Sequence, residues 1–291
     1  MFLSPSTAHE TSQSSKCTPF IMNVIQCSEY FGRGDEPVAF QYSRIIFQRD
    51  GLLYEGRSTS RYRSKTDVKE EDLYKITAIA VENLHPDYER NFTKACNYLE
   101  TDEWYVKRLN LSHYDLQNPD RLKGQTIEEV KTCEYLKERP HPNIAVYHGC
   151  EVKDGKITGL CFQRYGETLM ERVNPMKYNK QRFPVEVGGG ISPHIEHIER
   201  WLDNIKGGIL HLHSLGIIHN DINPSNIMFD GDTPVIIDFG SCRPRGHDLG
   251  MVGRTYEWHD SSIMEAKPSN DLDALEEMRH WLSGSVENFK F

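Results

Sequence analysis

The sequence lacks the long apolar runs and paired cysteines that mark membrane proteins and disulfide-built domains. No stretch reaches the about 18 consecutive apolar residues that a membrane-spanning helix needs. The seven cysteines are scattered and none forms a Cys-x-x-Cys pair, which favours free thiols over disulfides or a zinc site. The N-terminus has no basic-then-apolar signal pattern. We therefore expect an intracellular protein, in the cytoplasm or nucleus, with no membrane partner.

Positive charge is also scarce. The formal net charge of -9 argues against nucleic acid as a partner, because binding a phosphate backbone needs a basic face. The basic cluster at 57–65 is interpreted as a solvated loop. An apolar content of 37% and a charged content of 26% are typical of globular chains, and 291 residues allow one large domain or two lobes that share a cleft.

What the sequence does contain is a polar run between apolar strands at 215–240. Asp221 and Asn226 follow Ile217-Ile218, and Asp238 follows a second apolar run. Each part alone could be an ordinary buried strand or turn. Together they place two carboxylates and an amide at strand ends, and magnesium-type cations prefer such oxygen donors. The stretch therefore predicts a site for a divalent cation and a polyphosphate.

The same run resembles the catalytic loop and metal-binding motif of protein kinases. His219-Asn220-Asp221-Ile222 with Asn226 resembles H-R-D-L-x-x-x-N, and Asp238-Phe239-Gly240 matches D-F-G. The pattern is similar to a group of fungal protein-kinase-domain proteins of poorly defined role. The resemblance implies an α+β, two-lobed fold: a small antiparallel β-sheet lobe with one helix, and a mainly helical large lobe. It also implies ATP and Mg²⁺ as cofactors.

The expected domain organisation follows from this resemblance. Residues 1–18, rich in Ser and Thr, are predicted to be a disordered tail, and 19–74 a strand-rich region that completes the small lobe or forms an appendage. The small lobe is expected at 75–162, the hinge at 163–168 and a truncated large lobe at 169–291. Hairpins are predicted around Asp50-Gly51 and Asp154-Gly155, and a long amphipathic helix at 195–215.

Two further residues are expected to hold the nucleotide from the small lobe. Lys107 lies on a predicted strand at 103–109 that resembles the V-A-I-K strand, whose Lys pairs with the ATP phosphates. A helix is predicted at 125–138, with Thr126 as its N-cap and Glu129 as the capping-box partner. The resemblance requires one Glu of this helix to pair with the lysine. Glu129 is the choice and Glu128 the fallback, although Glu129 could instead be only a cap or a solvated charge.

The resemblance assigns a role to each remaining residue of the site. Asp221 is the catalytic residue, which accepts or orients the acceptor hydroxyl proton, while Asn226 and Asp238 hold magnesium. His219 and Gly240 support the loop structurally. Asp271 is expected to tie down the catalytic loop, with an exposed helical carboxylate as the alternative.

Several departures from the kinase pattern leave activity open. Gly32 and Gly34 match a glycine-rich loop only in part, because Pro37 stands at the third glycine position. Asn220 replaces the usual Arg, so control by a phosphorylated activation loop is not expected, and Asn223 replaces a frequent Lys. The leading hypothesis is an ATP- and magnesium-dependent kinase of Ser or Thr in protein. The alternatives are a pseudokinase that binds nucleotide or protein, and a small-molecule kinase; the sequence names no acceptor.

Overall fold

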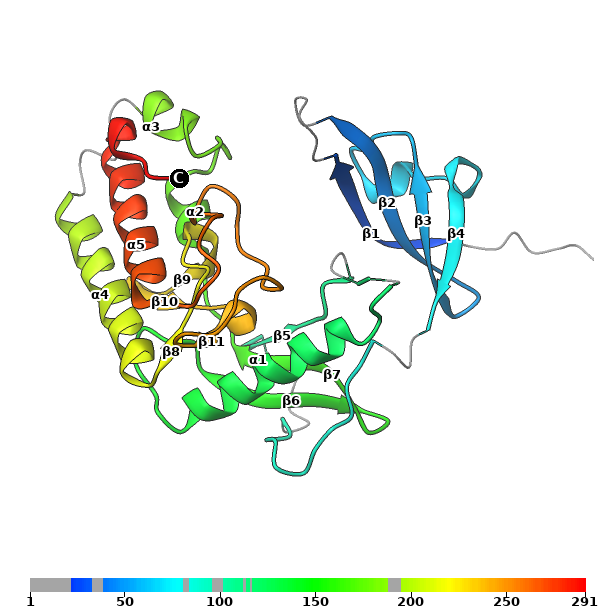
Figure 1. Cartoon of the computed structure of the whole chain (residues 1–291), viewed down its shortest axis with the longest axis horizontal. Helices are drawn as coiled ribbons and strands as arrows, with labels where there is room; N and C mark the ends of the chain where they lie inside the picture. Colours follow the sequence, from blue (N-terminus) through cyan, green and yellow to red (C-terminus); the bar gives the residue numbers. More distant parts are fainter. Residues whose placement is uncertain are drawn as a thin grey trace, which may run out of the picture. The chain divides into compact units, whose positions relative to one another are not determined.

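The structure is a computed structural model that divides the chain into two compact units, Met1–Val81 and Glu82–Phe291 (Figure 1). The structure describes residues 22–32, 39–80, 84–95, 102–111, 114–115, 117–187 and 195–291. The expected tail at 1–18 therefore lies outside the described residues.

The first unit is an antiparallel sheet in which sequence neighbours pair. Its strands, in sheet order, are β1 (Asn23–Phe31), β2 (Phe40–Arg49), β3 (Leu52–Ser58) and β4 (Tyr74–Ile79). The predicted Asp50-Gly51 hairpin is confirmed: both residues have positive φ, 53° and 78°, as a two-residue turn between twisted strands requires. Ile45, Phe47 and Val68 form a small buried cluster of this unit.

The strand predicted at the start of the small lobe belongs to this first sheet. β4 pairs with β3 through Leu53 opposite Ile79 and Glu55 opposite Thr77. The boundary between the units thus follows Val81, whereas the sequence reading began the small lobe at residue 75. The apolar pattern of 75–81 indicates a strand, but it carries no information about which neighbouring strand pairs with it.

The second unit begins with a small lobe of three strands and one helix. β5 (Trp104–Lys107), β7 (Lys156–Gln163) and β6 (Tyr147–Lys153) form an antiparallel sheet in that order. The β6–β7 hairpin turns at Asp154-Gly155, as predicted, with positive φ at both residues. The helix α1 (Arg121–Lys137) packs against β6 (Figure 1).

The large lobe is mainly helical. Its helices are α2 (Leu169–Val173), α3 (Arg182–Glu186), α4 (Ile195–Ser214) and α5 (Pro268–Ser283). Short strand pairs lie between the last two: β8 (Ile217–Ile218) with β11 (Arg243–Pro244), and β9 (Ile227–Asp230) with β10 (Thr233–Ile236). The helices α4 and α5 pack side by side (Figure 1), and one continuous apolar core joins both lobes of this unit. The α+β, two-lobed arrangement expected from the resemblance is confirmed.

A glycine in α4 sets the position of the strand that leads to Asp238. A Cβ on Gly208 would come within 2.9 Å of Ile236 Cδ1 and 3.0 Å of the Asn143 carbonyl. The helix can therefore approach both only because this residue has no side chain. Ile236 in turn pairs with the 143–145 segment, donating its N–H to Asn143 O at 2.9 Å. Asp238, two residues later, is thereby fixed below the small lobe.

Within the described ranges, no helix is both long and apolar enough to cross a bilayer.

Candidate functional site

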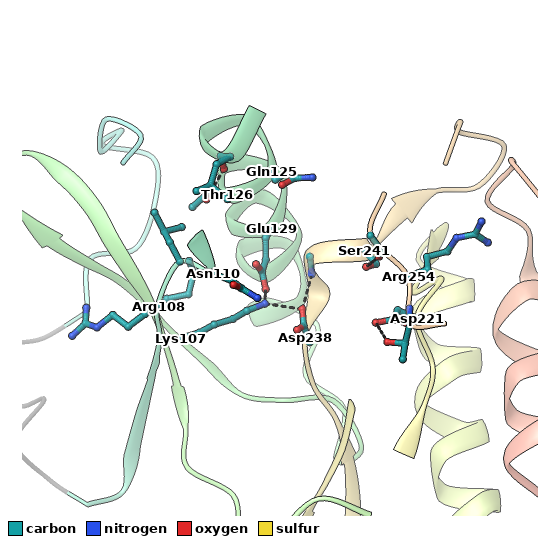
Figure 2. Close-up of a pocket in the computed structure, with 16 residues that line it drawn as sticks. Lys107, Arg108, Asn110, Gln125, Thr126, Glu129, Asp221, Asp238, Ser241 and Arg254 are labelled. Carbon is teal, nitrogen blue, oxygen red and sulfur yellow. Dashed lines mark hydrogen bonds and ion pairs between the residues drawn. The ribbon is translucent and has the colours of Figure 1, made fainter. Parts of the chain in front are cut away.

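Lys107 lies at the end of β5 and contacts two carboxylates from distant parts of the chain. Its Nζ donates to Glu129 Oε1 at 2.6 Å and to Asp238 Oδ1 at 2.7 Å. Figure 2 shows these three side chains meeting between the sheet, α1 and the segment after β10. The Lys107 side chain is 26% exposed and that of Glu129 is 10% exposed, so the charges interact in a partly dry environment. The structure thus brings together three of the residues singled out from the sequence.

The choice of Glu129 over Glu128 is settled by the face of α1 that each occupies. Glu128 is exposed and pairs with Lys131 on the helix surface, whereas Glu129 points inward to Lys107. The predicted capping box was wrong. The helix begins at Arg121, five residues before Thr126, and the buried Thr126 hydroxyl donates to the Leu122 carbonyl within the helix. A Thr-x-x-Glu pattern occurs inside helices as well as at their starts, so it could not fix the boundary.

Asp238 adopts a left-handed backbone that aims its carboxylate toward the small lobe. Its φ is 63°, and its Oδ1 also accepts from the Gly240 N–H at 3.2 Å. A Cβ on Gly240 would lie 3.3 Å from that Oδ1 and 3.5 Å from Glu129 Oε2, so a larger residue would crowd both acids. Phe239 is buried and its ring contacts those of Phe162 and His219. The support that Gly240 gives to the site is therefore steric.

The two carboxylates around Lys107 respond differently to burial. Burial and the other carboxylate raise the pKa of Glu129, and the Lys107 ammonium offsets this only in part. Burial would also raise the pKa of Asp238, but here Lys107 outweighs it and the pKa is lowered. Burial alone would lower the pKa of Lys107, yet Glu129 and Asp238 together raise it. The lysine is therefore held as an ammonium and Asp238 as a carboxylate.

Asp221 is surrounded by hydrogen-bond donors from its own loop and from the segment after Asp238. Its Oδ1 accepts from the Thr255 N–H at 2.7 Å. Its Oδ2 accepts from the Thr255 hydroxyl at 3.1 Å and from Asn226 Nδ2 at 2.9 Å. Burial raises the pKa of Asp221, although the Thr255 N–H opposes the shift. A carboxylate in this environment is a stronger proton acceptor than one in water.

The side-chain nitrogen of Asn226 is already used by Asp221. Nδ2 donates to both the carbonyl and the carboxylate of Asp221, which leaves Oδ1 for a cation. Among the residues that the structure describes, no group of three or more His, Cys, Asp or Glu side chains could hold a metal. Magnesium commonly uses one or two protein oxygens together with phosphates and water. Asn226 and Asp238 therefore fit magnesium better than a cation that needs a complete protein cage.

His219 supports the loop structurally, as the resemblance implied. It is fully buried. Its Nδ1 accepts from the Asp221 N–H at 3.3 Å, and its Nε2 lies 3.1 Å from the Ile237 carbonyl. Both ring nitrogens of His219 are therefore engaged within the chain. The ring joins the catalytic loop to the strand that carries Asp238 and has no nitrogen left to act as a base.

Asp271 is a fully buried residue of α5 rather than an exposed helical carboxylate. It accepts from the backbone N–H groups of His219 at 2.9 Å and Asn220 at 2.7 Å. The third partner is His213 Nε2, at 2.8 Å. His211, two residues earlier in α4, instead contacts the Arg139 carbonyl. Asp271 thus ties the catalytic loop to both long helices.

The sequence did not predict the contacts that Asn220, Asn223 and Thr255 make in the site. Asn220 has φ 64° and its amide bridges Ile218 O and Ser241 O. Asn223 Nδ2 donates to the Thr255 hydroxyl at 3.1 Å. An Asn in a loop tolerates left-handed backbone, so Asn220 carried a usable signal. Nothing local marks Thr255, because Asp221 and Asn223, which its side chain contacts, are more than 30 residues away.

The candidate glycine-rich loop lies in the first unit, between β1 and β2. Gly32 donates its N–H to the Ala39 carbonyl at 3.0 Å. The rest of the motif, including Gly34 and Pro37, falls outside the described residues.

The comparisons with known proteins agree with this geometry. A family model described as protein kinase domain matches residues 91–258. The chain is 30% identical over 139 residues to protein kinase MCK1 of Saccharomyces cerevisiae, covering 45% of this chain and 34% of that protein. It is 27% identical over 257 residues to MAP kinase kinase kinase win1 of Schizosaccharomyces pombe, covering 84% of this chain and 16% of that protein.

A human relative extends the range of organisms. The serine/threonine-protein kinase Nek5 of Homo sapiens is 24% identical over 172 residues, which are 57% of this chain and 22% of that protein. The chain thus corresponds to about a third or less of the length of these relatives. The family model covers more than half of the sequence and contains Lys107, Glu129, Asp221, Asn226 and Asp238, and the chain therefore belongs to the protein kinase domain family.

Proposed function

We propose that the chain transfers the γ-phosphoryl group of ATP, with magnesium, to a Ser or Thr hydroxyl in a protein. The observation that carries this proposal is the convergence of Lys107 on Glu129 and Asp238 in one cleft. Phosphoryl transfer needs positioning and charge neutralisation more than covalent chemistry. An ammonium fixed between two acids, beside a third acid, Asp221, whose pKa is raised, meets that need.

Two cavities that share Lys107 and Asp238 suit the two ends of a nucleotide. One, of about 390 Å³, is lined by Phe162 to Gly166 of the hinge; the other, of about 320 Å³, reaches Asp221 and Thr255. We place the base in the first and the phosphates toward the second. Within the described residues, the hinge N–H groups of Arg164 and Gly166 donate to the Glu103 and Phe229 carbonyls. The N–H groups of Tyr165 and Glu167 have no backbone partner there, and of these two residues Tyr165 lines the cavity. Tyr165 is therefore the hinge donor that we assign to the adenine edge.

Each acidic residue then has a separate task. The acceptor hydroxyl would displace the Thr255 hydroxyl from Oδ2 of Asp221. Asp221 would then orient the acceptor hydroxyl and take its proton. Asp238 would exchange its contact with Lys107 for magnesium, and Asn226 Oδ1 would complete the protein ligands. Bound magnesium supplies positive charge against the phosphates. Lys107 would turn to the phosphates while Glu129 keeps it in place.

The Ser/Thr direction and the protein acceptor rest on relatives. Nek5 is named as a serine/threonine-protein kinase, and so is the mimivirus protein L670, which is 27% identical over 136 residues. We therefore infer a hydroxyl of Ser or Thr as the acceptor and keep the small-molecule kinase as an outcome of the test.

A specific observation favours a second candidate, a pseudokinase that binds nucleotide without transferring phosphate. Both oxygens of Asp221 are occupied by donors of the chain itself. Asn223 stands where many Ser/Thr kinases have a lysine and adds no charge near the γ-phosphate. In this reading the fold is a ligand-binding module.

Radiolabelled ATP with magnesium separates these candidates. We expect the label to reach the protein itself or generic protein acceptors. The Asp221→Asn variant should transfer no phosphate but should still bind ATP. Asp230→Asn, a change at an exposed carboxylate at the end of β9, is the control and should keep activity. If no transfer occurs but ATP with magnesium raises the melting temperature, the pseudokinase is supported. Transfer only to metabolites in an acceptor screen would identify a small-molecule kinase instead.

A further inference from the structure

A buried lysine lies outside the proposed ATP site, just before α3. Lys180 is 4% exposed. Its Nζ donates to the Glu257 carbonyl, to the Glu277 carboxylate of α5 and to the Phe291 carbonyl at 3.0 Å. The rings of Trp258 and Phe289 lie 5.0 and 4.7 Å from the ammonium. All three of its protons have acceptors, and aromatic faces cover the rest.

Its charge partner is buried as completely. Glu277 has no exposed surface, and its second oxygen accepts from the Lys290 N–H at 2.8 Å. A buried ion pair pays a desolvation cost that its attraction only roughly offsets, so such a pair is weak evidence for a contribution to stability. The more informative observation is what the ammonium holds in place.

One of the three acceptors belongs to a strained backbone. Glu257 has φ 68°, a left-handed conformation that non-glycine residues adopt at a cost. It follows Thr255 by two residues, and Thr255 contacts both oxygens of Asp221. Trp258, the next residue, packs edge-on against Trp281 of α5 and covers Lys180. The buried pair therefore anchors the chain immediately beyond the contact with the proposed catalytic carboxylate.

We propose that Lys180 is a positioning residue for phosphoryl transfer. By binding the Glu257 carbonyl it keeps the backbone left-handed, and this holds Thr255 against Asp221. The inference rests on the proposed function for its catalytic consequence, whereas the placement of Thr255 can be measured without any activity.

The test is a double replacement that removes both buried charges at once. Lys180→Met with Glu277→Gln leaves apolar bulk among the aromatic rings and an acceptor for the Lys290 N–H, and no uncompensated charge is created. The matched control is Arg279→Met with Glu199→Gln, which removes an ion pair between α5 and α4 that does not contact Glu257. Both proteins are measured as full chains, well below their melting temperatures.

Two readouts distinguish positioning from stability alone. Hydrogen exchange of the Thr255 amide should be at least tenfold faster in the double variant, with exchange in α1 unchanged. The kcat for transfer should fall at least tenfold while the KM for ATP stays within twofold, because Lys107, Glu129 and Asp238 are untouched. The control should match the natural chain in both.

A second pair of variants tests the same link from the surface, in case the buried replacement prevents folding. Glu257→Val disfavours positive φ through its branched side chain and should reproduce the loss, whereas Glu257→Gly accepts positive φ freely and should not. Unchanged Thr255 exchange in the folded double variant, or equal effects of Val and Gly, would overturn the proposal. If the natural chain transfers no phosphate, the proposed function fails and the exchange rates alone decide this inference.

Discussion

Lys107 carries one positive charge between two carboxylates, so it cannot neutralise both. The pKa of Asp238 is lowered, and that of Glu129 is raised because burial and the neighbouring carboxylate outweigh Lys107. The ionised form of Glu129 is therefore less favourable in the folded chain than in the unfolded chain at neutral pH. Its value lies in orienting Lys107 rather than in stability.

The Glu129→Gln variant tests the different pKa shifts of Glu129 and Asp238. At pH 7 the replacement removes both the burial cost of the Glu129 charge and its attraction to Lys107, so these two effects on the free energy of unfolding oppose each other. As the pH falls from 7 toward the ordinary Glu value of 4.5, the natural chain should gain stability relative to the variant, since a raised pKa favours protonation of the folded state. Urea unfolding at several pH values measures this gain.

The affinity for ATP with magnesium should fall in the Glu129→Gln variant. Lys107 freed from Glu129 is poorly oriented, so we expect at least about a tenfold loss of affinity, or about 1.4 kcal/mol. The control is Glu128→Gln, at an exposed position of the same helix, which should change neither property. Equal effects of the two variants would show that Lys107 does not depend on Glu129.

At the scale of elements, the catalytic loop is held mainly by the two long helices. Asp271 of α5 receives two backbone N–H groups of the loop, and His213 of α4 fixes the same carboxylate. The Asn220 amide adds contacts to Ser241 and, through its oxygen, to Asn270 of α5. These bonds order the loop without a phosphorylated residue, in line with the absence of the usual Arg at 220.

Asp271→Asn should weaken this junction. An amide supplies one acceptor where the carboxylate supplies two, so at least one buried N–H loses its partner at a cost of about 1–3 kcal/mol. We expect a lower free energy of unfolding and a lower kcat. Asp273→Asn on the same helix is the control; its side chain is 40% exposed and pairs only with Lys290, so the change should stay within about 0.5 kcal/mol. A stable, fully active Asp271→Asn protein would contradict the role of the junction.

At the scale of the whole molecule, every residue of the candidate site lies in the second unit. The first unit has its own sheet and its own apolar cluster, and the second has a core that joins both of its lobes. The residues that we assign to the nucleotide therefore all belong to the second unit.

A chain that begins at residue 82 should accordingly fold and bind ATP with magnesium within about threefold of the full chain, a free-energy difference of about 0.6 kcal/mol. Calorimetric titration of both proteins measures this. The fragment with Asp238→Asn serves as the non-binding control. Loss of binding in the fragment would mean that 1–81 supplies part of the site, and its Gly32-to-Val38 segment would then be the first place to look.

The sequence by itself determined the catalytic loop and the motif after it. His219, Asp221 and Asn226 lie within eight residues of each other, and Asp238 follows the adjoining hairpin of β9 and β10. Spacing over so short a stretch fixes which side chains share an edge. The turns at Asp50-Gly51 and Asp154-Gly155 were readable for the same reason, because their geometry depends on neighbouring residues only.

Only the tertiary structure decided the contacts that join distant segments. Packing between elements far apart in the chain decided where α1 begins and which strand pairs with β4. It also decided the contact of Thr255 with Asp221 and the buried contacts of Lys180. Local patterns of charge and hydropathy are compatible with several such pairings. The choice among them comes from burial and from the need to satisfy each buried polar group, and both are properties of the folded chain.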